Sequence, residues 1–345
     1  MSTVTKATRA TGSTAARRTV DSDSLADGVL ARERSALARA ITLVESSRPA
    51  HRERAQAVLQ RLLPRTGKAI RLGISGVPGV GKSTFIEALG LKLVEAGHRV
   101  AVLAIDPSSQ VTKGSILGDK TRMNALSLRE EAYIRPSPTS GHLGGVTRMT
   151  RESILLCEAA GFDVVIVETV GVGQSETVVA DMVDCYLVLM LPGAGDELQG
   201  IKKGVLELAD MIAVNKADGD MRHEALQARA AYERALSILQ PAHGWRAPAL
   251  TCSASTGEGL DEIWEQVRTH RRQAIDSGEH VARRERQRVR WFHASVEQRL
   301  LESLRDGGEI EASMADAEHA VRDGTVTVTQ ASERVIDVWR TARRT

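Results

Sequence analysis

The chain has 345 residues, with 46 lysines and arginines against 44 aspartates and glutamates, so its formal net charge is +2. This balance gives no argument for a nucleic-acid or membrane-surface partner. Apolar residues make up 42% and aromatic residues 3% of the chain, so a core can form mainly from aliphatic side chains. No apolar run reaches the roughly 18 residues that a membrane-spanning helix needs. We therefore predict neither a membrane partner nor a nucleic-acid partner.

The N-terminal region differs in composition from the rest of the chain. Residues 1–23 are rich in Ser, Thr, Ala and Arg, which favours a disordered tail over the organelle transit peptide that they weakly resemble. Apolar residues such as Leu30, Leu37 and Ile41 recur at helical spacing and predict a helical extension over residues 24–66, whose second helix ends at Pro64.

From residue 67 to about residue 278, short β-branched runs alternate with helical stretches. Continuous apolar strands separated by helices indicate an α/β fold with a mostly parallel central sheet, covered on both faces. Such sheets bind ligands at the carboxyl ends of their strands. The predicted strands are Ala69–Gly76, Arg99–Asp106, Phe162–Glu168, Cys185–Leu191, Met211–Asn215 and Ala249–Ser253.

The C-terminal region, residues 279–345, has a basic helix predicted over 280–305 and a final helix over Ser332–Arg344. It has too few apolar residues for a core of its own, so we expect it to pack on another chain or on the body of this one. The basic run Arg283–Arg290 is followed at once by Trp291 and Phe292. We interpret it as a solvated or partner-facing helix face rather than a nucleic-acid site.

The three cysteines, Cys157, Cys185 and Cys252, are odd in number and far apart. This spacing argues against a disulfide framework and favours a reducing compartment. We therefore predict a soluble, cytoplasmic protein.

Residues 76–83 match the pattern G-x-x-x-x-G-K-[ST] and stand between a predicted strand and a helix predicted over Phe85–Ala96. Glycines let a backbone wrap closely around a polyphosphate, and the N-terminus of the following helix favours anions. We expect Lys82 to contact the β- and γ-phosphates and the Ser83 hydroxyl to bind Mg²⁺. The predicted phosphate loop comprises Gly76, Val77, Pro78, Gly79, Val80, Gly81, Lys82, Ser83 and Thr84.

Two further patterns bear on the identity of the base. Residues 215–218 form an N-K-x-D pattern, whose aspartate can accept hydrogen bonds from the guanine N1–H and 2-amino groups, a donor pair that adenine lacks. Residues 253–255 end the next strand, where a GTPase places a loop whose backbone N–H meets the guanine oxygen. The two patterns together predict GTP and GDP as ligands in preference to ATP. The predicted base-binding residues are Asn215, Lys216, Asp218, Ser253, Ala254 and Ser255.

Acidic residues near the predicted strand ends are candidates for magnesium binding and hydrolysis. Glu168 begins the sequence E-T-V-G, where a GTPase usually has D-x-x-G, and Gly171 is expected to bond the γ-phosphate through its N–H. Glu168 can hold Mg²⁺ through a water or position the attacking water, and Asp106 and Asp119 are further candidate ligands. Each acid can alternatively cap a strand or helix. We predict Lys82, Glu168, Asp119 and Gly171 as catalytic residues, and Ser83, Asp106, Asp119 and Glu168 as the Mg²⁺ site.

The residues that accelerate hydrolysis in many small GTPases are not at their usual places. Val172 follows Gly171 directly, where those proteins have a glutamine, and the next glutamine is Gln174. The sequence also identifies no arginine finger. We therefore expect slow intrinsic hydrolysis that a partner accelerates.

Beyond these motifs, several longer segments resemble the MeaB/ArgK family, P-loop GTPases that chaperone adenosylcobalamin-dependent acyl-CoA mutases, chiefly methylmalonyl-CoA mutase. The resemblance covers about residues 25–335. It implies a P-loop NTPase fold of the SIMIBI type, with a G domain over 67–278 and a C-terminal helical dimerisation arm over 279–345. The segments that carry it are Asp106–Ser109, Leu117–Met123, Tyr133–Pro138, His142–Arg148, Glu168–Glu176 and Gly195–Gly204.

The resemblance also implies partners. Members of the family act as homodimers that exchange a C-terminal helical arm, and their client is the mutase; a cobalamin adenosyltransferase is a second candidate partner. In the family, an additional switch transmits the nucleotide state to the mutase and its cofactor supply. The matching residues here are Gly195, Asp196, Glu197, Gln199, Lys202 and Lys203.

Two alternative functions remain at this point. A metallochaperone GTPase for a nickel enzyme shares the general fold but needs clustered soft or imidazole ligands, whereas the nine histidines and three cysteines here are dispersed. A kinase of a transport protein, the activity once attached to the ArgK name, needs a protein-acceptor site and a base near the γ-phosphate. Formation of a stable phosphoprotein distinguishes the kinase from the GTPase.

Overall fold

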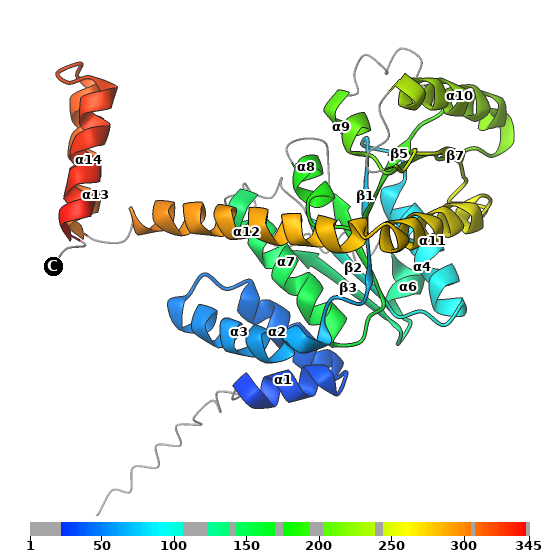
Figure 1. Cartoon of the computed structure of the whole chain (residues 1–345), viewed down its shortest axis with the longest axis horizontal. Coiled ribbons are helices and arrows are strands. Elements are labelled where there is room, and N and C mark those ends of the chain that lie inside the picture. Colours follow the sequence, from blue (N-terminus) through cyan, green and yellow to red (C-terminus); the bar gives the residue numbers. More distant parts are fainter. Residues whose placement is uncertain are drawn as a thin grey trace, which may run out of the picture.

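The structure is a computed structural model that describes residues 22–105, 123–137, 143–169, 175–193, 203–238, 244–304 and 308–342. Its centre is one sheet of seven parallel strands in the order β3-β2-β4-β1-β5-β6-β7 (Figure 1). The α/β fold predicted from the sequence is therefore confirmed. The strands are β1 Ile70–Gly76, β2 Val100–Ile105, β3 Ala132–Ser137, β4 Val164–Thr169, β5 Cys185–Met190, β6 Met211–Val214 and β7 Ala249–Thr251.

The strand that the sequence analysis missed is β3. Among the described strands it pairs with β2 alone, at one edge of the sheet. Its sequence A-Y-I-R-P-S contains a proline and an arginine, which interrupt the apolar run that identifies a buried strand. An edge strand tolerates both residues because one of its sides makes no ladder hydrogen bonds.

The core has two layers because alternate residues of each strand face opposite sides of the sheet. In β4, for example, Val165 and Val167 belong to one buried cluster, whereas Val164 and Ile166 belong to the other. The helices around the sheet are α4 Lys82–Glu95, α6 Asn124–Ser127, α7 Leu143–Ala159, α8 Ser175–Ala180, α9 Lys203–Leu208, η3 Gly219–Met221, α10 Arg222–Ile238 and α11 Leu260–Asp276. The first cluster includes residues of α7, α8 and α10, and the second includes residues of α4, α6 and α11.

The N-terminal helices pack against α7 and extend the first layer (Figure 1). They are α1 Ser22–Leu30, α2 Arg34–Val44, α3 Pro49–Leu62 and the short 3₁₀ helix η1 Leu63–Arg65. Apolar residues on their inner faces, including Leu37 and Ile41, are almost fully buried. Gln56 of α3 also donates a hydrogen bond of 2.9 Å to Glu152 of α7.

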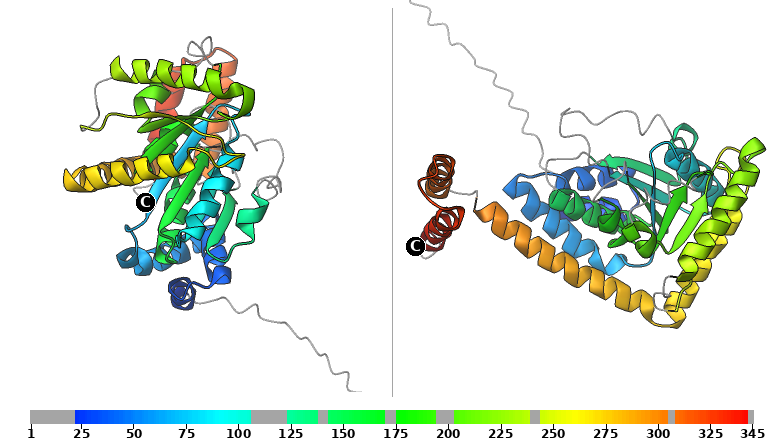
Figure 2. Two further views of the ribbon diagram at one scale, coloured as in Figure 1. Left: turned by 90° about the vertical axis from the view of Figure 1, so that its right-hand side faces the viewer. Right: turned by 90° about the horizontal axis from the view of Figure 1, so that it is seen from above.

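The C-terminal region begins with α12, Glu279–Ser303, which meets α11 at a sharp corner and runs along the body (Figure 2). A hairpin of α13, Gly308–Arg322, and α14, Val328–Ala342, stands apart from the body beyond the far end of α12 (Figure 1). The sequence analysis did not predict α13.

Aspartates fix the amino edge of the sheet. Asp163, Asp184 and Asp210 lie directly before β4, β5 and β6. Their carboxylates accept backbone N–H bonds from Arg99 at 2.7 Å, Arg71 at 2.9 Å and Tyr186 at 2.8 Å. Each aspartate thus binds the neighbouring strand and helps to set the register.

All three cysteines are buried and free. Burial raises the pKa of the Cys157 and Cys185 thiols far above the usual range, and it raises the pKa of Cys252 to about 12. The thiols are therefore kept in their neutral form and act as small apolar side chains. Among the helices of the described ranges, none is both long enough and apolar enough to cross a bilayer.

Candidate functional site

The predicted phosphate loop connects β1 to α4 at the carboxyl edge of the sheet. Its shape depends on glycine at two positions. A Cβ on Gly76, whose φ is 153°, would lie 2.4 Å from the Leu189 carbonyl oxygen, and one on Gly81, whose φ is 90°, would lie 3.1 Å from Asn215 Nδ2. Only glycine fits both positions without strain. The loop therefore passes close to β5 and β6 and leads directly into the N-terminus of α4.

Lys82, the first residue of α4, folds back over the loop. Its Nζ atom donates to the carbonyl oxygens of Gly76 at 2.8 Å and Val77 at 3.4 Å. Val80 is fully buried, whereas Pro78, Gly79 and Thr84 are exposed. The ammonium group thus lies within hydrogen-bond distance of the start of a loop whose next residues are exposed, an arrangement that suits a polyphosphate.

Two residues of the predicted magnesium site are in contact. Ser83 Oγ donates to Glu168 Oε1 at 3.3 Å, and Glu168 is only 3% exposed at the end of β4. The next residue, Thr169, donates its hydroxyl proton to Ser75 at 2.9 Å, inside the core. The start of the phosphate loop is thereby tied to the strand that leads to Gly171.

Other predicted residues lie outside the described part of the chain. These are Asp106, Asp119 and Gly171 of the magnesium and catalytic set, and Gly195, Asp196, Glu197, Gln199 and Lys202 of the predicted switch. Lys203 is the first residue of α9. Their roles stay predictions.

Asn215 joins the three nucleotide motifs. Its side chain is 1% exposed. Nδ2 donates to the Val80 carbonyl oxygen in the phosphate loop at 2.8 Å, and Oδ1 accepts from the backbone N–H of Ala254 at 3.0 Å. Cys252 Sγ lies 3.6 Å from the same Oδ1 atom. The sequence analysis treated Asn215 as part of a base-reading pattern, whereas its contacts here link the loop, the N-K-x-D segment and the 253–255 segment.

The remaining base-binding candidates lie on either side of this link. Lys216 is exposed, with a left-handed φ of 60°, and Asp218 is half-buried. The Ser253 and Ser255 hydroxyls are 2.9 Å apart, and the Ser253 hydroxyl also accepts from the backbone N–H of Thr256 at 3.2 Å. The two segments are held together where the strands β6 and β7 end, as the sequence order predicts.

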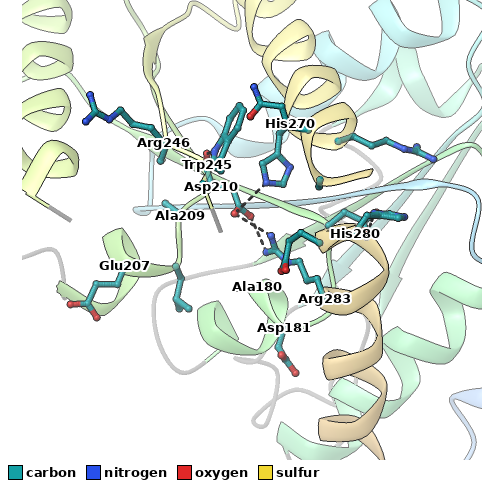
Figure 3. Close-up of a pocket in the computed structure, with 18 of the residues that line it drawn as sticks. Ala180, Asp181, Glu207, Ala209, Asp210, Trp245, Arg246, His270, His280 and Arg283 are labelled. Atoms are coloured by element: carbon teal, nitrogen blue, oxygen red, sulfur yellow. Dashed lines mark hydrogen bonds and ion pairs between the residues drawn. The ribbon is translucent and has the colours of Figure 1, made fainter. Parts of the chain in front are cut away.

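A cavity of about 690 Å³ lies at the opposite, amino edge, where α8, α9, α11 and α12 meet (Figure 3). Asp210 is at its centre and accepts two hydrogen bonds from Arg283, at 3.1 and 2.9 Å. His270 Nε2 lies 3.6 Å from Asp210 Oδ1. Burial alone would raise the pKa of Asp210, but the contacts with His270 and Arg283 outweigh it and lower that pKa.

A buried ion pair lies beside this cavity. Arg284 is 7% exposed, and it donates to both oxygens of Asp184, at 2.8 and 2.7 Å. It also donates to the carbonyl oxygen of Ala69 at 2.8 Å. Burial opposes ionisation of Asp184, but Arg284, with help from Arg71, lowers its pKa to about 2.

The interpretation of the basic run 283–290 as a solvated or partner-facing helix face is therefore wrong for Arg283 and Arg284. Arg283 and Arg284 point into the body and anchor α12 to the amino ends of β5 and β6. Arg290 pairs with Asp181, directly after α8, and Asp181 also accepts from Arg151 of α7 at 2.6 Å. The sequence could have suggested this, since an aspartate directly precedes each of these strands.

The fold and the site together define a P-loop GTPase. The family described as Methylmalonyl Co-A mutase-associated GTPase MeaB matches residues 37–309, and this chain belongs to it.

Relatives support the assignment over nearly the whole chain. GTPase ArgK of Escherichia coli is 49% identical over 296 residues, which cover 86% of this chain and 89% of that one. The mouse protein named Methylmalonic aciduria type A homolog, mitochondrial, is 45% identical over 329 residues, 92% of this chain and 79% of that one. A crystal structure named LAO/AO transport system kinase has a TM-score of 0.72 and 39% identity, and covers 92% of this chain and 96% of that one. The predicted family and the GTP-hydrolase activity are thus confirmed.

Proposed function

We propose that this GTPase acts as a chaperone of an adenosylcobalamin-dependent acyl-CoA mutase, with methylmalonyl-CoA mutase as the client, by gating cofactor loading and protecting the mutase. The observation that carries the proposal is the match to a mutase-associated GTPase family over residues 37–309. The structure supports it because α8, which follows Glu168 of the candidate GTP site in the chain, leads to Asp181, and Asp181 pairs with Arg290 of the C-terminal helix α12.

In this proposal Lys82 and the loop backbone bind the phosphates, and Asp218 and the 253–255 segment read guanine. Asn215 keeps these parts in register through its bonds to Val80 and Ala254. Correct placement of the phosphates and the base therefore depends on these two bonds of Asn215, besides any contact that Asn215 itself makes to the base.

Mg²⁺ is the proposed cofactor. Ser83 Oγ and Glu168 Oε1 are hard oxygen donors 3.3 Å apart, beside the first turn of α4, and such donors suit Mg²⁺. When bound, the ion would neutralise charge on the β- and γ-phosphates. Asp106 and Asp119 are proposed to complete the site.

The route from nucleotide to partner is proposed to pass through Asp181. This residue follows α8, the helix that comes directly after residues 170–174, and it contacts both Arg151 of α7 and Arg290 of α12. A change at Gly171 that moved α8 would therefore also change the contact between Asp181 and Arg290 of α12. The segment 195–203, which leads into α9, is proposed to contact the mutase or a cobalamin adenosyltransferase.

We further propose a homodimer formed through the C-terminal helices. Val289, Phe292, Val296 and Leu300 are exposed on α12 at a spacing of three, four and four residues, which places them along one face. Apolar residues of α13 and α14, among them Met314 and Val335, line a groove of about 500 Å³ in the hairpin. A second copy could cover both surfaces.

A kinase function is the second candidate, because the similar crystal structure carries the name of a transport system kinase. The two candidates differ in the fate of the γ-phosphate. The kinase leaves a stable phosphoprotein, whereas the GTPase releases inorganic phosphate.

The test is steady-state hydrolysis of GTP and of ATP with Mg²⁺, each with and without purified methylmalonyl-CoA mutase. We expect a GTP preference, a slow rate alone and a faster rate with the mutase. The Asp218→Asn variant should lose its preference for GTP over XTP, because an amide donor at residue 218 suits the carbonyl that xanthine carries at position 2. A rate that the mutase does not change, or a preference for ATP, would contradict the proposal.

A further inference from the structure

A separate cavity of about 400 Å³ lies at the amino edge of the sheet, where the C-terminal ends of α1 and α7 meet the start of β1. Three cationic side chains, Arg32, Arg65 and Lys68, line it, together with the apolar side chains of Leu30 and Phe162. The nucleotide motifs lie at the other edge of the sheet. The cavity is therefore distinct from the candidate GTP site.

The two acids that line this cavity balance only part of its charge, because Glu158 is already paired with Arg71 and three cationic side chains face Asp163 alone. Glu158 accepts from Arg71 at 2.8 and 3.0 Å and from the backbone N–H of Gly67 at 2.6 Å. Asp163 contacts His98 at 2.8 Å and accepts from the backbone N–H of Arg99 at 2.7 Å.

The three cations differ from these two acids in their contacts. Within the described ranges, Arg32, Arg65 and Lys68 form no ion pair with a carboxylate. The cavity thus combines three exposed cationic side chains, none of them paired with a carboxylate in the described part of the chain, with the apolar side chains of Leu30 and Phe162.

Arg32 occupies a backbone position that favours glycine. Its φ is 63°, and it lies just after the C-terminal end of α1. Its backbone N–H donates to the Val29 carbonyl oxygen at 3.0 Å, and the backbone N–H of Glu33 donates to the Gly28 carbonyl oxygen at 2.9 Å. An arginine in the left-handed region is strained relative to glycine, and such strain is concentrated at functional sites.

The opposite wall of the cavity accommodates this arginine closely. A Cβ on Gly161 would lie 2.9 Å from Arg32 Nε, so the guanidinium packs directly against the glycine backbone. The close approach of residues 32 and 161 holds the guanidinium at the cavity wall.

We propose that this cavity binds a small organic phosphate. Guanidinium groups bind phosphate oxygens in pairs, and an ammonium group adds a point charge, so the three cations suit a dianionic phosphate better than a carboxylate. Half-buried Leu30 and the 6% of Phe162 that stays exposed offer contact to a compact apolar or aromatic group attached to it. The volume is in the range of small-molecule sites.

The test is titration calorimetry of the full-length protein, saturated with GDP and Mg²⁺ so that the phosphate loop is occupied. The probes are phenyl phosphate, inorganic phosphate and benzoate. We expect phenyl phosphate to bind most tightly, because only it supplies both the dianion and the ring. Binding by benzoate as tight as by phenyl phosphate would overturn the assignment to phosphate.

The decisive variant is Arg32→Gly. Glycine relieves the left-handed strain, so the melting temperature should stay the same or rise, while phenyl phosphate binding weakens about tenfold or more. Lys68→Ala should weaken it similarly. Arg234→Ala on α10, an exposed arginine away from the cavity, is the matched control and should bind as the wild type does. Unchanged binding by Arg32→Gly, or no binding by the wild type up to about 10 mM phenyl phosphate, would refute the proposal.

Discussion

At the carboxyl edge of the sheet, the candidate GTP site is made largely from backbone groups and small side chains. At the amino edge, charged side chains from distant parts of the chain meet and become buried. The Asn215 links at the carboxyl edge involve backbone groups of Val80 and Ala254. The Asp184–Arg284 pair at the amino edge joins residues 100 positions apart.

The difference reflects what each edge does. A phosphate loop must present its own N–H groups to a ligand, so bulky side chains would obstruct it. The amino edge has to hold the long helix α12. The ion pairs between its arginines and the aspartates of this edge fix where α12 lies along the sheet and how it is oriented. We therefore expect substitutions at the amino edge to change mainly the free energy of unfolding and the position of α12. Substitutions at the carboxyl edge should change mainly nucleotide binding and hydrolysis.

The largest effect should come from Asp184→Asn. The change leaves Arg284 buried opposite a neutral amide, and breaking a buried pair in this way costs about 3–5 kcal/mol of unfolding free energy. Urea unfolding at neutral pH measures it. Asp261→Asn is the control, because Asp261 pairs with Lys92 at the surface and its side chain is 83% exposed; it should cost under about 1 kcal/mol. Equal costs for the two variants would remove the contrast between a buried and a surface pair.

Lys82→Ala should have the largest effect at the carboxyl edge. It removes the ammonium group that we expect to contact the β- and γ-phosphates, so the kcat for GTP should fall about 10²–10³-fold with little change in unfolding free energy. Lys92→Ala, on the same helix, is the matched control for kcat. A Lys82→Ala enzyme with nearly normal turnover would show that the phosphate loop is not the reaction site.

The acid dependence of stability should identify Asp184 separately. Its pKa in the folded state is lowered to about 2, so its contribution is fully present above the ordinary pKa near 4 and is lost as the pH falls toward 2. A shift of this size corresponds to roughly 2–3 kcal/mol. The difference in unfolding free energy between wild type and Asp184→Asn should therefore narrow by about that amount between pH 5 and pH 2. A constant difference over this range would contradict the ion-pair explanation.

Asn215→Ala should have a smaller effect that involves both properties. It leaves the Val80 carbonyl and the Ala254 N–H without their partner, at about 1–3 kcal/mol for such a buried group. Because the link joins the loop to the base-reading segments, the dissociation constant for GDP should rise about tenfold. Asn124→Ala, at an exposed position in α6, should change neither. A loss of stability with unchanged GDP affinity would limit Asn215 to a structural role.

Much of the carboxyl edge could be predicted from the sequence because its chemistry is local. Residues 76–83 and 215–218 carry their information in fixed spacing, and the strand before the second pattern is a continuous apolar run. By contrast, β3 and α13 were missed because neither has a long apolar pattern: β3 is an edge strand with a proline, and α13 buries only Ile310.

The amino edge could not be predicted in the same way. Charged side chains on a helix usually face solvent, and Arg283 and Arg284 depart from that rule only because Asp210 and Asp184 lie opposite them in three dimensions. The helical periodicity of α12 contains no information about these partners. An aspartate before each strand was the available local signal.

The most direct test of the account is the stimulation of GTP hydrolysis by purified methylmalonyl-CoA mutase, measured for the wild type and for Asp181→Asn. Asp181 lies outside the nucleotide motifs but contacts both Arg151 and Arg290. We predict that the variant keeps its basal rate within about twofold and loses most of the stimulation, because it separates α8 from the anchor of α12. Full stimulation in the variant, or none in the wild type, would contradict the account.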